Sequence, residues 1–184
     1  EMEQIKNKGA MATTRSFETT LTNLTDIKER ISTFASSCAE KLRRQNSNCH
    51  MVIVFLKSNR FKIQSKQYRA STIVSIPFPT DSTLVISANA IKAIESIFKE
   101  GIQYKKAGVI LTGIVPSYNR QLQMFDHEDP RHRPLMSAID RLNNKYSTKK
   151  LKLANQDLKR TWKMRQAHLS PGYTTNLKDI IKVK

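Results

Sequence analysis

The 184-residue chain lacks the features on which the common classes of enzyme depend. It has only five glycines, and none of them forms a glycine-rich loop of the kind that cradles phosphates. Its acidic residues fall mostly on predicted helix surfaces and caps, whereas magnesium-dependent phosphoryl transfer needs carboxylates that converge on one site. The serines have no histidine or lysine at a recognisable catalytic spacing. We therefore expect no catalytic residues and no enzymatic activity in this chain by itself.

Metal-binding and membrane-spanning patterns are also missing. The two cysteines, Cys38 and Cys49, fit no CxxC or zinc spacing, and the four histidines show no ligand spacing, so we expect no metal and no cofactor. Reduced thiols packed as small hydrophobic groups are typical of a cytoplasmic protein. No apolar run approaches the roughly 20 residues of a spanning helix, so we expect no membrane contact. Because the chain opens without methionine or a signal peptide, residues 1–9 are interpreted as a linker from a missing upstream domain.

Positive charge is abundant, with a formal net charge of +17. Between residues 41 and 80 there is no acidic residue, and between residues 141 and 184 only Asp157 and Asp179 oppose a dense series of lysines and arginines. A solvated surface usually mixes charges of both signs. Long stretches of one sign favour a surface that binds a polyanion, and nucleic acid is the first candidate.

The hydrophobic pattern predicts an α+β fold. Alternation over residues 10–17 indicates a first strand. The almost continuously apolar residues 49–56 indicate a central strand that could be covered on both faces. Residues 68–78 read as a third strand broken by Pro77 and Pro79, and residues 104–115 read as a fourth. Two helices are expected between them, one opened by Thr25 as N-cap and one opened by Asp81 and ended by Gly101.

The resulting order, β-α-β-β-α-β, predicts a four-stranded sheet with both helices on one face. In the second helix the expected apolar stripe is Leu84, Ile91, Ile94, Ile97 and Phe98. The open face should carry small hydroxyl residues together with Arg15, Lys57, Lys62 and either Lys105 or Lys106. Such a face suits nucleic acid, although long cations in water would explain it as well.

Beyond residue 125 the pattern loosens. Leu135, Met136, Ile139 and Leu142 predict a short helix, and residues 151–154 could form a short strand. This small, mixed and loosely packed C-terminal region cannot bury a large core alone, so it should pack minimally on itself, on the first domain or on a partner. The expected division is residues 10–116 as a DNA-binding domain, 117–134 as a linker, and 135–184 as the C-terminal region.

Several motifs together resemble the C-terminal part of the UmuC family of error-prone Y-family DNA polymerases, the catalytic subunits of bacterial DNA polymerase V. They are AMATTRSF, YKKAGVIL, QLQMFD and, most specifically, WKMRQAHLSPGYTT followed by IIKVK. The C-terminal signature comprises Trp162, Met164, Arg165, Leu169, Ser170, Pro171, Tyr173, Thr174 and Thr175. The resemblance implies that residues 10–116 form a little-finger domain that grips DNA. It also implies that the polymerase active site, with its Mg²⁺, lies in upstream domains.

The resemblance implies roles for particular residues. The implied DNA-binding residues are Thr14, Arg15, Ser16, Lys57, Arg60, Lys62, Lys105 and Lys106. Phosphate contacts of this kind would give a grip that does not depend on sequence.

The segment QLQMF resembles the peptide by which bacterial polymerases bind the sliding clamp. Gln121 would enter a polar subsite, and Leu122, Met124 and Phe125 would fill an apolar pocket. The alternative is a segment folded back on its own domain. The further partners implied are the UmuD′ dimer and RecA, in SOS mutagenesis and DNA repair.

Two other functions remain open from the sequence. A free-standing RNA- or ribosome-binding protein would explain the charge, but RNA platforms usually offer aromatic residues on the open face, and these strands offer mostly Thr, Ser, Lys and Arg. A pure protein-interaction module is the third possibility. Titration with primer–template DNA, single-stranded RNA and the clamp would separate them.

Overall fold

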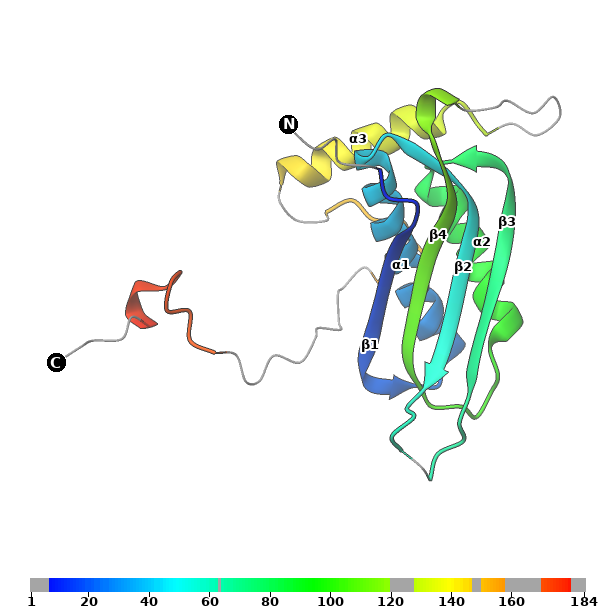
Figure 1. Cartoon of the computed structure of the whole chain (residues 1–184), viewed down its shortest axis with the longest axis vertical. Coiled ribbons are helices and arrows are strands. Elements are labelled where there is room, and N and C mark those ends of the chain that lie inside the picture. The colour runs from blue at the N-terminus through cyan, green and yellow to red at the C-terminus, as the bar shows by residue number, and fades with distance from the viewer. Residues whose placement is uncertain (1–6, 63, 120–127, 147–149, 158–169, 180–184) are drawn as a thin grey trace.

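The computed structural model describes residues 7–62, 64–119, 128–146, 150–157 and 170–179 (Figure 1). Its elements, in chain order, are β1 (Met11–Leu21), α1 (Leu24–Arg44), β2 (Ser47–Ser58), β3 (Arg69–Thr80), α2 (Thr83–Ile97), β4 (Tyr104–Pro116), a short 3-10 helix (Ser117–Asn119), α3 (His132–Lys145) and a second 3-10 helix (Leu177–Asp179). The predicted α+β class and the β-α-β-β-α-β order are confirmed.

The four strands form one antiparallel sheet in the order β1-β4-β2-β3. Each helix joins strands that are separated by one other strand, because α1 leads from β1 to β2 and α2 leads from β3 to β4. Both helices cover the same side of the sheet, which leaves the other side open, as Figure 1 shows. We call these two sides the helix face and the outer face.

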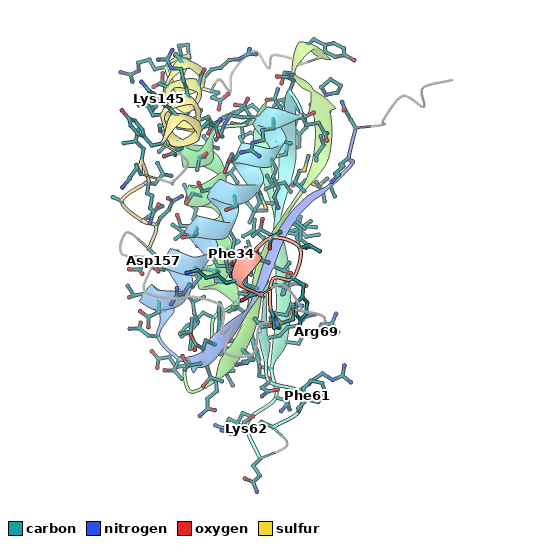
Figure 2. The ribbon with its side chains drawn as sticks, turned by 90° about the vertical axis from the view of Figure 1, so that its left-hand side faces the viewer. Phe34, Phe61, Lys62, Arg69, Lys145 and Asp157 are labelled. Atoms are coloured by element: carbon teal, nitrogen blue, oxygen red, sulfur yellow. The ribbon has the colours of Figure 1, made fainter. Side chains whose placement is uncertain are left out.

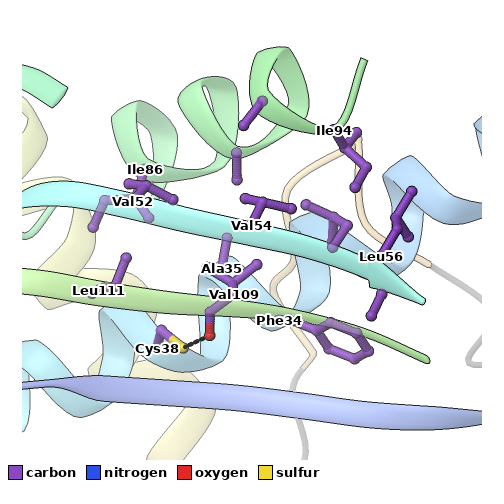
Figure 3. Close-up of a cluster of buried hydrophobic side chains, with 14 of the residues drawn as sticks. Phe34, Ala35, Cys38, Val52, Val54, Leu56, Ile86, Ile94, Val109 and Leu111 are labelled. Carbon is purple, nitrogen blue, oxygen red and sulfur yellow. Dashed lines mark hydrogen bonds between the residues drawn. The ribbon is translucent and has the colours of Figure 1, made fainter. Parts of the chain in front are cut away.

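The core lies between the helices and the helix face (Figure 3). Val52, Val54 and Leu56 of β2 point into it and are fully buried, while the residues between them lie on the outer face and are only half-buried. The apolar run of β2 therefore did not indicate a strand covered on both faces, and that interpretation was wrong. A central strand needs only every second side chain for the core.

The prolines do not break the third strand. Pro77 and Pro79 both lie within β3, which is an edge strand, in the irregular stretch where Ile76 to Pro79 oppose the single residue His50. Proline is tolerated at sheet edges and bulges because no ladder hydrogen bond is lost there.

Both helices begin differently from the sequence prediction. Asn23 rather than Thr25 caps α1, and its side-chain oxygen accepts a hydrogen bond from the backbone N–H of Thr25 at 2.9 Å. α2 begins after Ser82 rather than at Asp81, and it ends at Ile97, before Gly101. Gly101 instead takes a positive φ of 76° in the turn that leads to β4, a conformation that favours glycine.

The buried stripe of α2 was only partly predicted. Ile94 is buried as expected, but Leu84 and Ile91 are half-buried, and the packed positions are Thr83, Ile86, Ser87, Ala90, Ala93 and Ile94. Small residues on this stripe let α2 approach α1 and the sheet closely. Ser87 also bonds Ser32 of α1 at 2.8 Å between hydroxyl oxygens.

The predicted helix over residues 135–142 is confirmed as α3, but residues 151–154 form no strand. Polar contacts hold α3 and residues 150–157 against α1 and α2. Arg43 of α1 donates to both carboxylate oxygens of Asp140 at 2.6 and 2.8 Å, and Arg30 of α1 pairs with Asp157 at 3.2 Å. Asn155 bonds both Ser32 and Ser87. Met136, exposed by only 1%, adds the main apolar contact of α3.

Both cysteines are buried in the core, and burial raises the pKa of the Cys49 thiol to about 12. The nearby charge of Asp81 raises this pKa further. An unfolded chain ionises this thiol near its ordinary value of 9.0, whereas the folded chain keeps the proton. The stability that is present below pH 9 is therefore lost as the pH rises from about 9 towards about 12.

We expect Cys49 to lower the free energy of unfolding by about 1 kcal/mol between pH 8 and pH 10. Urea unfolding of the protein and of Cys49→Ala at both pH values, under reducing conditions, measures this contribution. The loss between pH 8 and pH 10 should be smaller by that amount in the variant. Equal losses in the two proteins would contradict the assignment.

Candidate nucleic-acid interface

The outer face is built from side chains that stand directly opposite one another on neighbouring strands. Residues paired across an antiparallel ladder point to the same face, and the strands lie about 4.8 Å apart. The pairing register therefore shows which side chains form rows across the sheet. Two such rows dominate the outer face.

The first row contains three cations. Lys106 of β4 pairs with Lys57 of β2, which pairs with Arg69 of β3, and Ser16 of β1 continues the row beyond Lys106. We call Lys106, Lys57 and Arg69 the cation row. None of the three forms an ion pair with a carboxylate in the described part of the chain. Like charges placed directly opposite one another destabilise a sheet, so this row is most favourable when an anion lies across it.

The second row is apolar and consists of Ile110, Ile53 and Ile73. Ile73 is 61% exposed. The open face therefore carries an apolar row beside the expected Thr, Ser, Lys and Arg, and the sequence interpretation did not include this row. Side chains do alternate between the two faces along each strand, but at these positions the isoleucines of three neighbouring strands lie side by side.

Between the two rows lies Phe55. Its ring occupies the space above Gly108, where an added Cβ would stand 2.5 Å from Phe55 Cε1 and 2.6 Å from Thr14 Cγ2. The Lys57 ammonium lies 5.1 Å from the centre of the ring. Gly108 thus lets the ring lie flat on the sheet, and the ring supports a member of the cation row.

Several predicted DNA-binding residues lie elsewhere. Arg15 pairs with buried Ala107, so it belongs to the helix face, and Thr14 and Ser16 occupy the outer face in its place. Arg15 lines a cleft of about 590 Å³ between α1, α3 and residues 150–157. Lys105 lies in the irregular stretch of the β1–β4 pair, where its Nζ donates to the backbone oxygen of Glu18 at 2.8 Å.

Arg60 and Lys62 belong to the β2–β3 loop rather than to the face. Lys62 Nζ donates to Gln103 Oε1 at 3.3 Å. Arg69 was not among the predicted binding residues. Counting residues outward from the loop along β2 and β3 would place Arg69 opposite Lys57. That count requires the length of the loop, because the loop length fixes the pairing register of a hairpin.

The other predicted sites are placed only in part. The clamp-binding residues 121–125 lie outside the described residues, as do Trp162, Met164, Arg165 and Leu169 of the C-terminal signature. The described part of that signature, residues 170–175, forms an exposed turn in which the Thr175 N–H bonds the oxygen of Gly172 at 3.0 Å. Asp179 accepts from the Gly172 N–H and from the Asn176 side chain.

Among the described residues, no group of three or more histidine, cysteine, aspartate or glutamate side chains is arranged to hold a metal ion. In the same ranges no helix is both long and apolar enough to cross a bilayer.

Comparison with known sequences agrees with a family that the motifs suggested. The model of the impB/mucB/samB family C-terminal domain matches residues 9–124, and this range contains the whole four-stranded sheet. The chain belongs to the impB/mucB/samB family. A second model, a domain of unknown function, matches residues 133–183.

Relatives within the impB/mucB/samB family cover almost the whole chain. Protein UmuC of Salmonella typhimurium is 32% identical over 179 residues, which are 96% of this chain and 42% of that protein. Protein SamB of Salmonella typhimurium is 31% identical over 96% of the chain, and protein MucB of Escherichia coli is 31% identical over 94%. The chain therefore spans about two fifths of the length of these relatives.

Among solved structures, the chain is similar to one described as a complex of the beta-clamp processivity factor and the little finger domain of PolIV. The match has a TM-score of 0.43 and 15% sequence identity, and it covers 64% of this chain and 99% of that chain.

Proposed function

We propose that this chain is the DNA-gripping part of an error-prone translesion DNA polymerase that acts in SOS mutagenesis and DNA repair. The observation that carries this proposal is the cation row on the open side of the sheet. Family membership and relatives more than twice as long as this chain support it, since the polymerase active site and its Mg²⁺ would then belong to other domains. Residues 10–116 are proposed as the DNA-binding domain.

The outer face favours binding that ignores base sequence. Lysine and arginine neutralise phosphates, and hydroxyls such as those of Thr14 and Ser16 can donate to them. The rows described above hold no asparagine, glutamine or carboxylate that could read base edges in the major groove. We propose primer–template duplex as the ligand of this face, with RNA binding as the alternative. The half-buried Phe55 and the isoleucine row are the features that favour the alternative.

Partner binding is proposed for the rest of the chain. Residues 117–134 are proposed to carry the sliding-clamp motif at Gln121, Leu122, Met124 and Phe125, and residues 135–184 to serve the contacts with UmuD′ and RecA. The linker is anchored at both described ends, since the Ser117 N–H bonds the Asn46 oxygen at 2.9 Å and Thr80 bonds Glu128. Both anchors lie at the end of the sheet where Ser47 pairs with Pro116, opposite the end that carries the cation row, so a clamp bound at the motif would leave the cation row free for DNA.

We expect the combined replacement of Lys57, Arg69 and Lys106 by alanine to lower duplex affinity by about tenfold to a hundredfold near 0.15 M salt. The unaltered protein, with about four to six phosphate contacts, should show a log–log salt slope of roughly −3.5 to −5.5. The variant should show a slope that is shallower by about 2.7. Fluorescence anisotropy with a labelled blunt duplex at several salt concentrations measures both quantities.

The matched control removes three cations from the helix side, namely Lys92 of α2 and Arg141 and Lys145 of α3, all of them exposed. Its net charge equals that of the test variant, so a general charge effect would weaken both proteins equally. Such an outcome, or a flat salt response, would refute the outer face as the interface. Parallel titration with double-stranded and single-stranded RNA decides between DNA and RNA.

A further inference from the structure

The loop between β2 and β3 exposes an aromatic ring to solvent. Phe61 lies in the loop of this hairpin, beyond the end of the sheet, and it is 82% exposed (Figure 2). A single exposed hydrophobic residue is common on protein surfaces and needs no explanation alone. Here, however, the loop around Phe61 is ordered and charged in a way that suits one kind of ligand.

Hydrogen bonds within the loop hold Phe61 in place. Asn59 Oδ1 accepts from the Phe61 backbone N–H at 3.1 Å. The Gln67 amide nitrogen lies 3.1 Å from the backbone oxygens of both Asn59 and Lys62, and 3.3 Å from that of Ser65. This one side chain thus occupies the centre of the loop and bonds its backbone from inside. A ring presented by an ordered loop loses little conformational entropy when it binds.

Cations surround the ring. The Arg60 guanidinium lies 5.4 Å from the centre of the Phe61 ring, and Lys62 and Lys66 are exposed on the same loop. At the base of the hairpin stand Lys57 and Arg69, two members of the cation row. Phe61 is the one apolar side chain among described loop residues 59–62 and 64–67.

We propose that Phe61 is a stacking site for an unpaired nucleobase of single-stranded DNA that continues from the duplex on the outer face. This inference rests on the proposed DNA-binding function. Inside a duplex the faces of the bases are already stacked, so away from the duplex ends a phenyl ring can stack only on an unpaired base. The ring supplies the base contact, and Arg60, Lys62 and Lys66 supply the phosphate contacts of the same strand, a combination used in sequence-tolerant single-strand binding.

The test compares three substitutions of Phe61 on two DNA ligands. One ligand is a blunt duplex, and the other carries a single-stranded overhang with 2-aminopurine at its first unpaired positions. Phe61→Ala should weaken binding to the overhang substrate by about fivefold to a hundredfold, because one stacked base contributes about 1–3 kcal/mol. It should also abolish the fluorescence change of 2-aminopurine. Phe61→Trp should preserve both signals, and Phe61→Leu should lose most of them because leucine is apolar but cannot stack.

Affinity for the blunt duplex should stay within about twofold in all three variants. Arg60→Ala serves as the charge control: it should make the salt slope on the overhang substrate shallower by about 0.7, the value for a single-strand contact, but keep the 2-aminopurine signal. The stacking site is overturned if Phe61→Ala binds the overhang as the unaltered protein does. It is also overturned if Phe61→Leu binds normally, or if both DNA ligands weaken equally. If the outer face does not bind duplex, the variant that lacks Lys57, Arg69 and Lys106 will bind duplex as the unaltered protein does. That result is distinct from any result at Phe61.

Discussion

Replacing Tyr104 by alanine is expected to lower the free energy of unfolding by about 3–5 kcal/mol. Tyr104 begins β4, is fully buried, and is among the largest enclosed side chains in the described structure. Its ring meets Tyr68 edge-on at 5.9 Å between centroids and lies 5.6 Å from the Phe98 ring. Removing it would leave a cavity where α2, the β3 edge and β4 meet, and a close-packed core relaxes into such a cavity only in part.

The Tyr104 hydroxyl provides a matched control. It accepts from the Lys99 backbone N–H at 2.8 Å and donates to the Lys99 oxygen at 3.0 Å, which fixes the turn after α2. Tyr104→Phe keeps the ring and should cost only about 1–2 kcal/mol, the usual range for losing such hydrogen bonds. Urea unfolding followed by circular dichroism measures both variants. An alanine variant as stable as the phenylalanine variant would show that the aromatic cluster does not anchor this end of the sheet.

Replacing Leu122, Met124 and Phe125 together by alanine is expected to weaken sliding-clamp binding by at least about a hundredfold. Each anchor should contribute roughly 1–2 kcal/mol when it is buried in an apolar pocket, and 1.4 kcal/mol corresponds to a factor of ten. Duplex affinity should not change, because no cation is altered. Calorimetric titration with the clamp and anisotropy with duplex DNA measure the two affinities on the same preparation.

Gln123→Ala is the control for this experiment, because Gln123 lies within the motif but is not one of its predicted anchors. It should bind the clamp within a few-fold of the unaltered protein. A thermal melt of the triple variant separates the two interpretations of the segment. If the melting temperature falls steeply and the unaltered protein never binds the clamp, the three residues belong to the folded core.

Sequence patterns were sufficient for the order of the elements because hydrophobic period differs so clearly between strands and helices. The prediction from these patterns failed to show on which face of the sheet a particular strand residue lies. Arg15 was expected on the open face beside Thr14 and Ser16, yet alternation along a strand does not permit all three to share it. Met11 and Phe17 alternate in the same set as Arg15 and are buried, so the apolar residues of β1 already indicated that this set points to the helices.

Other parts of the interface depend on pairing that local sequence does not contain. The cation row joins residues from three strands, and it requires the register of two ladders. Arg69 was missed for this reason, although Lys57 and Lys106 were found. Phe61 was passed over because nothing in its sequence neighbourhood reveals that Gln67 and Asn59 hold the loop in order around it.

The contact between Arg43 and Asp140 has a consequence for combining parts of different relatives in one chain. Arg43 lies in α1, inside the matched family domain, and Asp140 lies in α3, inside the second matched region, so the pair crosses the boundary between the two sequence models. Arg43 also donates to the Asp81 oxygen and to Thr83 at the start of α2, which places one guanidinium at the meeting point of three helices. A change at either residue leaves a partly buried charge without its counterpart. A chimera that takes each region from a different relative should therefore keep this pair, because losing it would weaken the docking of α3 on α1.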